Sequence, residues 1–249
     1  MDFGNLSNKR AFITGSCEGI GFAIATLLVA MGCEVIIHDK SDEEKCRLAA
    51  HKIDPKGSLC REFVVGDLGR MEELNHIQSQ LSNVDILVLN ASTQSRIDFE
   101  LLDKAIFDQE VNTNVWSSIA LVQRVIPHMK DSKWGRIVTL GSVQEVKPHP
   151  KMAIYASMKA ATSNLVKNLA LQYASLGITV NNVAPGVVAT ARNIEALSNE
   201  EYAATMLQKI PIGSFAKPED CAGIVAFLVS ELGNYITGQT IYCDGGMSL

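Results

Sequence analysis

Three residues in the middle of the chain, Ser142, Tyr155 and Lys159, have the types and the spacing of a proton-transfer centre. Tyr155 and Lys159 are four positions apart in a segment with helical periodicity, so we expect their side chains on one face of a helix. A tyrosine hydroxyl has an ordinary pKa of about 10, but an adjacent ammonium stabilises the phenolate and lowers that pKa. Ser142 follows an apolar run and is placed to donate a hydrogen bond to a substrate oxygen. Each feature alone is common on helices and turns, whereas the combination predicts acid–base chemistry at a substrate oxygen.

A second group of candidate residues lies at the first strand–helix junction, ITGSCEGIGFAIA. Its glycines follow the spacing G-x-x-x-G-x-G rather than the common G-x-G-x-x-G, but the loop directly follows a strand and opens an apolar helix. Small residues there let the backbone approach a pyrophosphate, and the helix N-terminus supplies free N–H groups. We therefore expect the following residues to bind a dinucleotide: Gly15, Ser16, Cys17, Glu18, Gly19, Ile20 and Gly21.

The end of the second predicted strand bears on which dinucleotide is bound. Asp39 lies about 20 positions beyond the glycine loop, where an acidic residue accepts hydrogen bonds from an adenosine ribose and repels a 2′-phosphate. Glu18 adds a negative charge where a site for a 2′-phosphate would need a basic residue. Lys40 is the opposing signal, because its ammonium could reach a phosphate. On balance the pattern favours NAD over NADP as the cofactor.

Short apolar segments alternate with segments of helical period along the whole chain. The predicted strands are 10–14, 34–38, 61–65, 85–90, 136–140, 178–183 and 239–243. The predicted helices lie near 19–31, 43–53, 71–81, 103–130, 152–176 and 217–231. This alternation predicts one doubly wound α/β (Rossmann) domain over residues 1–249, with a seven-stranded parallel sheet and helices on both faces. Residues 186–213 are longer than a usual connection, which is typical of a substrate loop.

Composition bounds the class of protein. The 249 residues are 47% hydrophobic and 20% charged, with a net charge of −5 and no long Lys/Arg cluster, so we expect neither nucleic acid nor a membrane surface as a partner. The N-terminus lacks an apolar secretory segment, and the longest apolar run, 22–31, is too short to span a bilayer. The six cysteines form no C-x-x-C pair and the five histidines show no metal-ligand spacing. We expect a cytoplasmic protein with reduced thiols and no metal site.

The motifs together resemble those of the short-chain dehydrogenase/reductase family. The resemblance rests on Thr14-Gly15-xxx-Gly19-x-Gly21, Ser142, Tyr155-xxx-Lys159, Pro185-Gly186 and the C-terminal YITGQTIYCDGG, in the order and spacing of the family over essentially the whole chain. Within the family, the sequence is most similar to bacterial 3-oxoacyl-carrier-protein reductases and to sugar or polyol dehydrogenases. The resemblance implies hydride transfer between a nicotinamide and a carbonyl carbon, with Tyr155 as acid or base and Lys159 also on the nicotinamide ribose. It also implies a homotetramer.

The resemblance assigns further residues to the cofactor. It places Asp67 and Leu68 on the adenine, and Asn90, Ala91 and Ser92 beside the ribose, although Ser92 stands where the family has glycine. Pro185, Gly186, Val188 and Thr190 match the segment that holds the nicotinamide carboxamide. Asn114 matches the asparagine of the family's proton relay, and Asn112 is the competing choice.

The residues expected around the substrate are mostly polar. They include Gln94, Gln144, His149 and Val187 beside Ser142 and Tyr155, with Thr93, Ser95 and Glu145 nearby. Such a lining favours a sugar, a polyol or a sugar acid. Arg192 could pair with a substrate carboxylate or with Glu195. A 3-oxoacyl-thioester reductase using NADPH is the alternative within the family, and a nucleotide-binding protein without turnover is the alternative outside catalysis.

Overall fold

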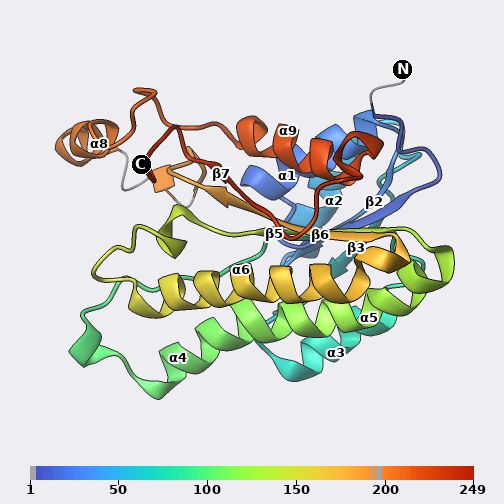
Figure 1. Cartoon of the computed structure of the whole chain (residues 1–249), viewed down its shortest axis with the longest axis horizontal. Helices are drawn as coiled ribbons and strands as arrows, with labels where there is room; N and C mark the ends of the chain where they lie inside the picture. The colour runs from blue at the N-terminus through green and yellow to red at the C-terminus, as the bar shows by residue number, and fades with distance from the viewer. Residues whose placement is uncertain (1–3, 192, 195–197) are drawn as a thin grey trace.

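In the computed structural model, the seven predicted strands form one parallel sheet in the order β3-β2-β1-β4-β5-β6-β7 (Figure 1). The structure describes residues 4–191, 193–194 and 198–249. The strands are β1 (Arg10–Ile13), β2 (Glu34–Asp39), β3 (Glu62–Val65), β4 (Ile86–Leu89), β5 (Gly135–Leu140), β6 (Ile178–Pro185) and β7 (Thr240–Cys243). β4, β5 and β6 are buried along their whole length. β4 is apolar throughout, as expected of a strand covered on both faces, whereas β5 and β6 also bury polar side chains such as Arg136, Asn181 and Asn182.

Helices cover both faces of the sheet (Figure 1). They are α1 (Gly19–Ala30), α2 (Glu43–Ile53), α3 (Met71–Gln80), α4 (Lys104–Val111), α5 (Ser117–Ser132), α6 (Ala153–Tyr173), α8 (Glu200–Leu207) and α9 (Pro218–Val229). One apolar core lies between the sheet and α1, α2 and α9. A second core lies between the opposite face and α3, α5 and α6. The predicted doubly wound α/β architecture is confirmed.

The region predicted as one helix over 103–130 contains an interruption. α4 and α5 are joined by a π-helical turn, η2 (Asn112–Trp116), and the segment continues to Ser132. The extra residue per turn of a π-helix reorients the side chains within it, and such turns are frequent at functional sites. Apolar periodicity cannot reveal this turn, because the residues on either side of it remain helical.

The order of the strands places a crevice at the carboxyl ends of β1 and β4. The chain first moves outward from β1 to β2 and β3, and then crosses back so that β4 pairs with the other side of β1. In an open α/β sheet, ligands bind where the order reverses in this way. The loops that follow β1, β4, β5 and β6 meet at this edge.

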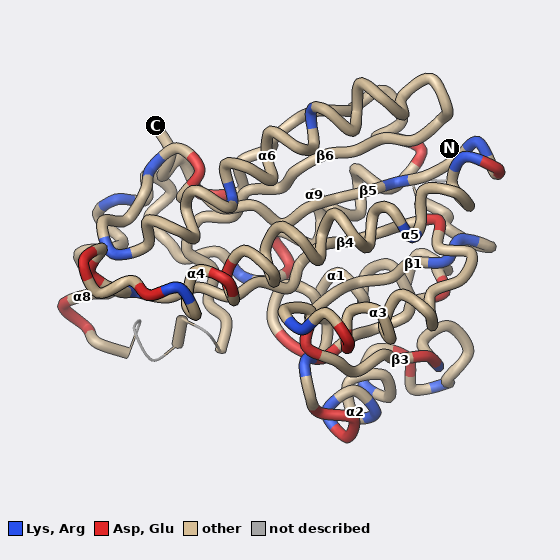
Figure 2. Tube along the Cα trace, turned by 90° about the horizontal axis from the view of Figure 1, so that it is seen from below, with Lys and Arg blue, Asp and Glu red and all other residues tan. Residues whose placement is uncertain are grey.

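Charged residues of both signs are interspersed along the trace (Figure 2). Among the helices that the structure describes, none combines the length and the apolar character needed to cross a bilayer.

Candidate active site

A cavity of about 510 Å³ lies at the carboxyl edge of the sheet, and residues from the loops after β1, β2, β3, β4, β5 and β6 line it. It extends from Asp39 and Asp67, at what we call the adenosine end, to Gln144 and His149, at what we call the substrate end. Tyr155 and Lys159 lie between the two ends. Sequence motifs as far apart as Gly15 and Thr190 therefore line one cavity.

The glycine loop has a backbone that only glycine adopts easily. Gly15 and Gly19 have φ values of +61° and +58°, in the left-handed region. A Cβ on Gly21 would lie 2.3 Å from the carbonyl oxygen of Gly15 and 2.6 Å from Nδ2 of Asn90, so no larger residue fits. The amide of Asn90 donates to the carbonyls of Thr14 and Gly15, which ties the loop after β1 to the loop after β4.

His38 supports this loop from β2, a role that sequence reasoning missed. Its Nδ1 accepts from the backbone N–H of Gly15 at 3.0 Å, and its Nε2 donates to the carbonyl of Gly66 at 2.9 Å. These partners require a neutral imidazole with its proton on Nε2. Burial lowers the pKa of His38, which keeps that neutral form.

The first turn of α1 fits a dinucleotide pyrophosphate. Glu18 is its N-cap residue but places no side-chain acceptor on the first-turn N–H groups, which remain available to an anion. Ser16 and Cys17 do not line the cavity: the Ser16 hydroxyl donates to the carbonyl of Ile13, and the Cys17 thiol lies 3.3 Å from that of Cys46. The side chains of Ser16 and Cys17 therefore support the loop on the side away from the cavity. Gly21 contributes by having no side chain, which lets the Gly15 carbonyl approach its Cα.

At the adenosine end, carboxylates and ammonium groups neutralise each other. Lys45, on α2, lies 3.1 Å from a carboxylate oxygen of Glu18 and 3.2 Å from one of Asp39. Lys40 lies 3.1 Å from a carboxylate oxygen of Asp67. Partial burial opposes the charge of Asp39, but hydrogen bonds from the Ser41 N–H and from Lys45 outweigh it and lower the pKa of Asp39. Lys45 was not expected from the sequence, because it lies six residues beyond the strand that carries Asp39.

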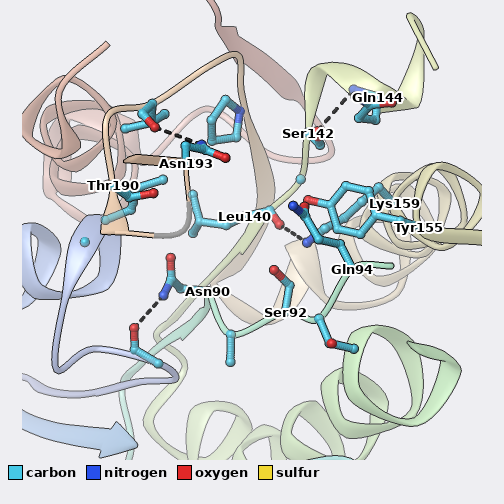
Figure 3. A pocket seen from close by; sticks show the side chains of 18 of the residues that line it. Asn90, Ser92, Gln94, Leu140, Ser142, Gln144, Tyr155, Lys159, Thr190 and Asn193 are labelled. Carbon is cyan, nitrogen blue, oxygen red and sulfur yellow. Dashed lines mark hydrogen bonds between the residues drawn. The ribbon is translucent and has the colours of Figure 1, made fainter. Parts of the chain in front are cut away.

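Ser142, Tyr155 and Lys159 converge in the middle of the cavity (Figure 3). Ser142 lies two residues after β5, as the N-cap of the short 3-10 turn Val143–Glu145. Tyr155 and Lys159 lie one turn apart on α6, as predicted. The Lys159 ammonium donates to the carbonyl of Leu140 at 2.5 Å and lies 5.6 Å from the centroid of the Tyr155 ring. Tyr155 and Lys159 are 7% and 5% exposed, so the ammonium acts on the phenol without much screening by water.

The conformation of Ser142 is set by a capping box. The Glu145 carboxylate accepts from the Ser142 N–H at 3.0 Å and from the side-chain amide of Asn182 at 3.0 Å. The Ser142 hydroxyl oxygen accepts from the Gln144 N–H at 3.1 Å, so its proton can be donated elsewhere. Glu145 was expected to face the substrate, but its carboxylate is used inside the loop and it does not line the cavity.

Asn114 lies behind the cavity wall rather than in it. It is the buried residue of the π-helical turn, and its side-chain amide exchanges two hydrogen bonds with the backbone of Thr93 at 3.1 and 2.9 Å. Glu110 accepts from the Ser95 N–H in the same segment. Both residues hold the loop after β4, which presents Ser92 and Gln94 to the cavity (Figure 3).

The segment after β6 forms the remaining wall. Pro185, Gly186, Val187, Val188 and Thr190 all line the cavity, as expected. Two further lining residues, Tyr202 and Met206, come from α8, so the long excursion over 186–213 does reach the site. Arg192 and Glu195 lie outside the described residues.

Asn193 fixes this wall and was not expected. Its side-chain amide donates to the carbonyl of Val188 at 2.9 Å, close to Thr190 (Figure 3). The Val188 carbonyl also accepts from the Thr190 N–H. It is therefore engaged within the segment and has less capacity for a ligand than the sequence suggested.

Comparisons with known proteins agree with this geometry. A family model described as enoyl-(acyl carrier protein) reductase matches residues 15–248. The 3-oxoacyl-[acyl-carrier-protein] reductase FabG of Rickettsia typhi is 37% identical over 244 residues, covering 98% of each chain. The chain belongs to the short-chain dehydrogenase/reductase family. It is accordingly an oxidoreductase that acts on CH–OH and C=O groups.

Relatives in the short-chain dehydrogenase/reductase family differ in substrate at similar distances from this chain. The 3beta-hydroxysteroid dehydrogenase 1 of Eggerthella lenta is 34% identical, covering 99% of this chain and 96% of the relative. A solved structure from Beutenbergia cavernae, described as a candidate NAD(P)-dependent gluconate 5-dehydrogenase with NADP bound at low occupancy, has a TM-score of 0.93. It is 31% identical and covers 99% of both chains. Identity alone therefore does not select an acyl thioester, a steroid or a sugar acid.

Proposed function

We propose that this short-chain dehydrogenase/reductase interconverts a secondary alcohol and a ketone on a small polar substrate, such as a sugar, a polyol or a sugar acid. The observation that supports this proposal most directly is the convergence of Ser142, Tyr155 and Lys159 in one cavity. Gln94, Gln144 and His149 line the same cavity, and their amide and imidazole groups suit a substrate rich in hydroxyls. Residues 1–249 act as one catalytic domain in this proposal.

The roles follow from the contacts of each side chain. During reduction, the Tyr155 hydroxyl transfers its proton to the carbonyl oxygen while Ser142 donates a hydrogen bond to that oxygen. The Lys159 ammonium, held by the Leu140 carbonyl, stabilises the phenolate that remains. A bound nicotinamide supplies the hydride to the carbonyl carbon, or accepts it in the opposite direction. Asn114 positions the wall that carries Ser92 and Gln94.

For the cofactor, we propose a nicotinamide dinucleotide with room for the 2′-phosphate of NADP(H). The NADP in the Beutenbergia cavernae structure supports NADP(H), and so do two lysines, Lys40 and Lys45, at the adenosine end. Asp39 supports NAD(H), because hydrogen bonds from Ser41 and Asp42 hold its carboxylate in place to accept from a ribose. We expect both cofactors to bind, with the Asp39–Lys45 pair setting the ratio.

A 3-oxoacyl-thioester reductase is the second candidate function. Its support is the 37% identity with FabG of Rickettsia typhi. The polar lining of the substrate end is the observation against an unmodified acyl chain, which would give no hydrogen-bond partner to the amide of Gln94 or to the amide nitrogen of Gln144.

The test is a turnover screen of the purified protein with NAD(H) and with NADP(H). The panel consists of polyols, aldonic acids, hydroxysteroids and 3-oxoacyl thioesters. We expect the highest kcat/KM on a polyhydroxy compound. A higher kcat/KM on a 3-oxoacyl thioester than on every polyhydroxy compound would transfer the assignment to the second candidate. Cofactor binding without turnover of any compound would favour the nucleotide-binding alternative.

We also propose a homotetramer, using the face formed by α4, η2 and α6. Large apolar side chains are exposed there, including Phe107, Trp116 and Leu171, the last at 85% exposure. Such side chains are typical of a surface that is covered by another subunit. Light scattering coupled to size-exclusion chromatography should give about four times the chain mass of 27.0 kDa.

A further inference from the structure

We propose that Arg96 recognises an anionic group, a carboxylate, on the substrate of this enzyme, so that the preferred substrate is a hydroxy or keto acid rather than a neutral polyol. This inference rests on the proposed function, because it concerns the same cavity, and it narrows the substrate class. Arg96 is a specificity-determining residue in this proposal, and the reaction remains the one centred on Tyr155.

Arg96 belongs to the wall of the cavity through its place in the loop after β4. It lines the cavity together with Gln94 from the same loop and His149 from the loop after β5. The two loops are joined next to Arg96 by a hydrogen bond from the Ile97 N–H to the Lys151 carbonyl at 2.9 Å. An ion pair between Lys151 and Asp98, at 3.0 Å, adds a second link. The backbone that carries Arg96 is thus held against the loop after β5 by these two contacts.

Among the described residues, the substrate end of the cavity has positive charge without a carboxylate in its lining to compensate it. Within the described part of the chain, the acidic residues that line the cavity are Glu18, Asp39 and Asp67, all at the adenosine end. No described carboxylate forms an ion pair with Arg96, which is exposed, whereas neighbouring Lys151 is paired with Asp98. A guanidinium in the cavity wall without an ion-pair partner among the described residues presents a planar set of N–H donors that suits a carboxylate in two-point contact.

The surroundings of His149 are consistent with this excess of positive charge. Its pKa is lowered first by burial and then by the cationic side chains of Arg96, Lys209 and Lys151. The Gln144 side-chain oxygen accepts from the backbone N–H of His149. The ring nitrogen Nδ1 of His149 accepts from the backbone N–H of Lys151, which orients the ring within the loop. Lys151 is compensated by Asp98, so the charges of Arg96 and Lys209 are the ones that favour an anion beside His149.

The anion is more consistent with a small acid than with an acidic carrier protein. Arg96 lines the same cavity as Tyr155, so a carboxylate bound there can belong to the molecule that reacts. On the outside, the chain continues to exposed Glu100, whose charge would repel an acidic protein surface. We therefore assign the site to the substrate's own carboxylate.

The test compares acids with neutral partners of matched shape. Aldonates such as gluconate and the corresponding alditols such as sorbitol differ chiefly at one terminal group. Turnover of both series is measured with the wild-type enzyme, Arg96→Gln and the control Arg47→Gln, which removes an exposed arginine of α2 remote from the cavity. We expect kcat/KM for at least one aldonate to exceed that for its alditol about ten- to a hundredfold, the range of a charge-assisted hydrogen bond. Arg96→Gln should remove this preference mainly through KM, and Arg47→Gln should retain it.

Calorimetric titration of gluconate and tartrate into the enzyme saturated with NADP⁺ separates this inference from the proposed function. Anion binding that Arg96→Gln abolishes, without turnover of any polyhydroxy compound, would sustain the anion site while refuting the proposed reaction. Turnover of alditols and aldonates at equal efficiency would refute the anion site while sustaining the reaction. An effect of Arg96→Gln confined to thioesters on an acidic carrier protein would also overturn our assignment.

Discussion

The adenosine end and the substrate end of the cavity handle charge in opposite ways. At the adenosine end, Lys45 pairs with Glu18 and Asp39, and Lys40 pairs with Asp67. At the substrate end, Arg96 has no such partner among the described residues. The first end is neutralised by its own side chains, whereas the second depends on a ligand for neutralisation.

This difference has consequences for specificity. Side chains that pair with each other can exchange partners, so the adenosine end can adjust to a cofactor with or without a 2′-phosphate at small cost. A charge without a partner disfavours a ligand that has no opposite charge, because binding that ligand removes water from the charge and gives no new ionic interaction to offset the desolvation cost. We therefore expect discrimination between substrates to be sharper than discrimination between cofactors.

The largest expected effect lies between the two ends, at Tyr155. Tyr155→Phe removes the proton that we assign to the substrate oxygen, so kcat should fall about 10²- to 10⁴-fold. Fluorescence titration should show unchanged NADPH and NADH binding, because the hydroxyl is not needed at the adenosine end. Activity within threefold of the wild type would contradict the assignment of Tyr155.

A smaller effect is expected at the adenosine end, where the comparison predicts adjustable specificity. Lys45→Ala should weaken NADPH binding about tenfold and NADH binding less than threefold, because a 2′-phosphate loses an ammonium partner. Asp39→Asn should shift the ratio toward NADPH by removing a negative charge. Both ratios are measured by titration of the cofactor fluorescence.

Lys52→Ala, an exposed lysine at the other end of α2, is the matched control and should leave the ratio unchanged. An equal loss of NADH and NADPH affinity in Lys45→Ala would show that Lys45 only supports the fold of the loop.

Glu145 tests whether the substrate end depends on internal positioning as well as on Arg96. Glu145→Gln retains the shape of the side chain but replaces one of its acceptor oxygens, which weakens its hold on Ser142 and Asn182. We expect kcat to fall about three- to tenfold with cofactor binding unchanged. Steady-state kinetics measure this effect, with Glu72→Gln as a remote control on an exposed helix position. A change in KM for cofactor alone would contradict a role at Ser142.

The smallest effect concerns stability at the adenosine end. Because the folded protein keeps His38 neutral while the unfolded chain protonates it, the unfolded state binds more protons below about pH 6.5, the ordinary pKa of histidine. The stability contribution is present above that pH and decreases as the pH falls. The free energy of unfolding should drop by up to about 1.4 kcal/mol per pH unit in the acidic range.

Urea denaturation between pH 5 and pH 8 measures this slope. His38→Asn should have a shallower slope than the wild type, whatever its absolute stability. Equal slopes in the two proteins would mean that His38 can accept a proton in the folded state.

Much of this molecule could be predicted from its sequence. The apolar runs located all seven strands, and the four-residue spacing placed Tyr155 and Lys159 on one helical face because that periodicity is a local property of the backbone. The glycine loop was predictable for a similar reason. Gly21 must lack a side chain because the Gly15 carbonyl lies in the way, and that requirement is visible in the residue type.

Contacts between distant segments were harder to predict. The sequence predicted that Glu145 faces the substrate because it lies next to Gln144, which lines the cavity, but Asn182 from β6 donates to its carboxylate. The side-chain amide of Asn193 donates to the carbonyl of Val188. Lys45, on α2, pairs with the carboxylates of Glu18 and Asp39. Nothing in the local sequence around these residues indicates which partner each side chain meets.

By itself, the sequence determined the strand–helix alternation, the shared helical face of Tyr155 and Lys159, and the glycine loop, because periodicity, spacing and backbone restrictions act over a few residues. Only the tertiary structure decided which charges are satisfied and which remain available. Ion pairing depends on distances of a few ångströms between side chains far apart in the chain, as between Lys45 and Glu18. That Arg96 has no ion-pair partner among the described residues became visible only when the loops after β4 and β5 were placed against each other.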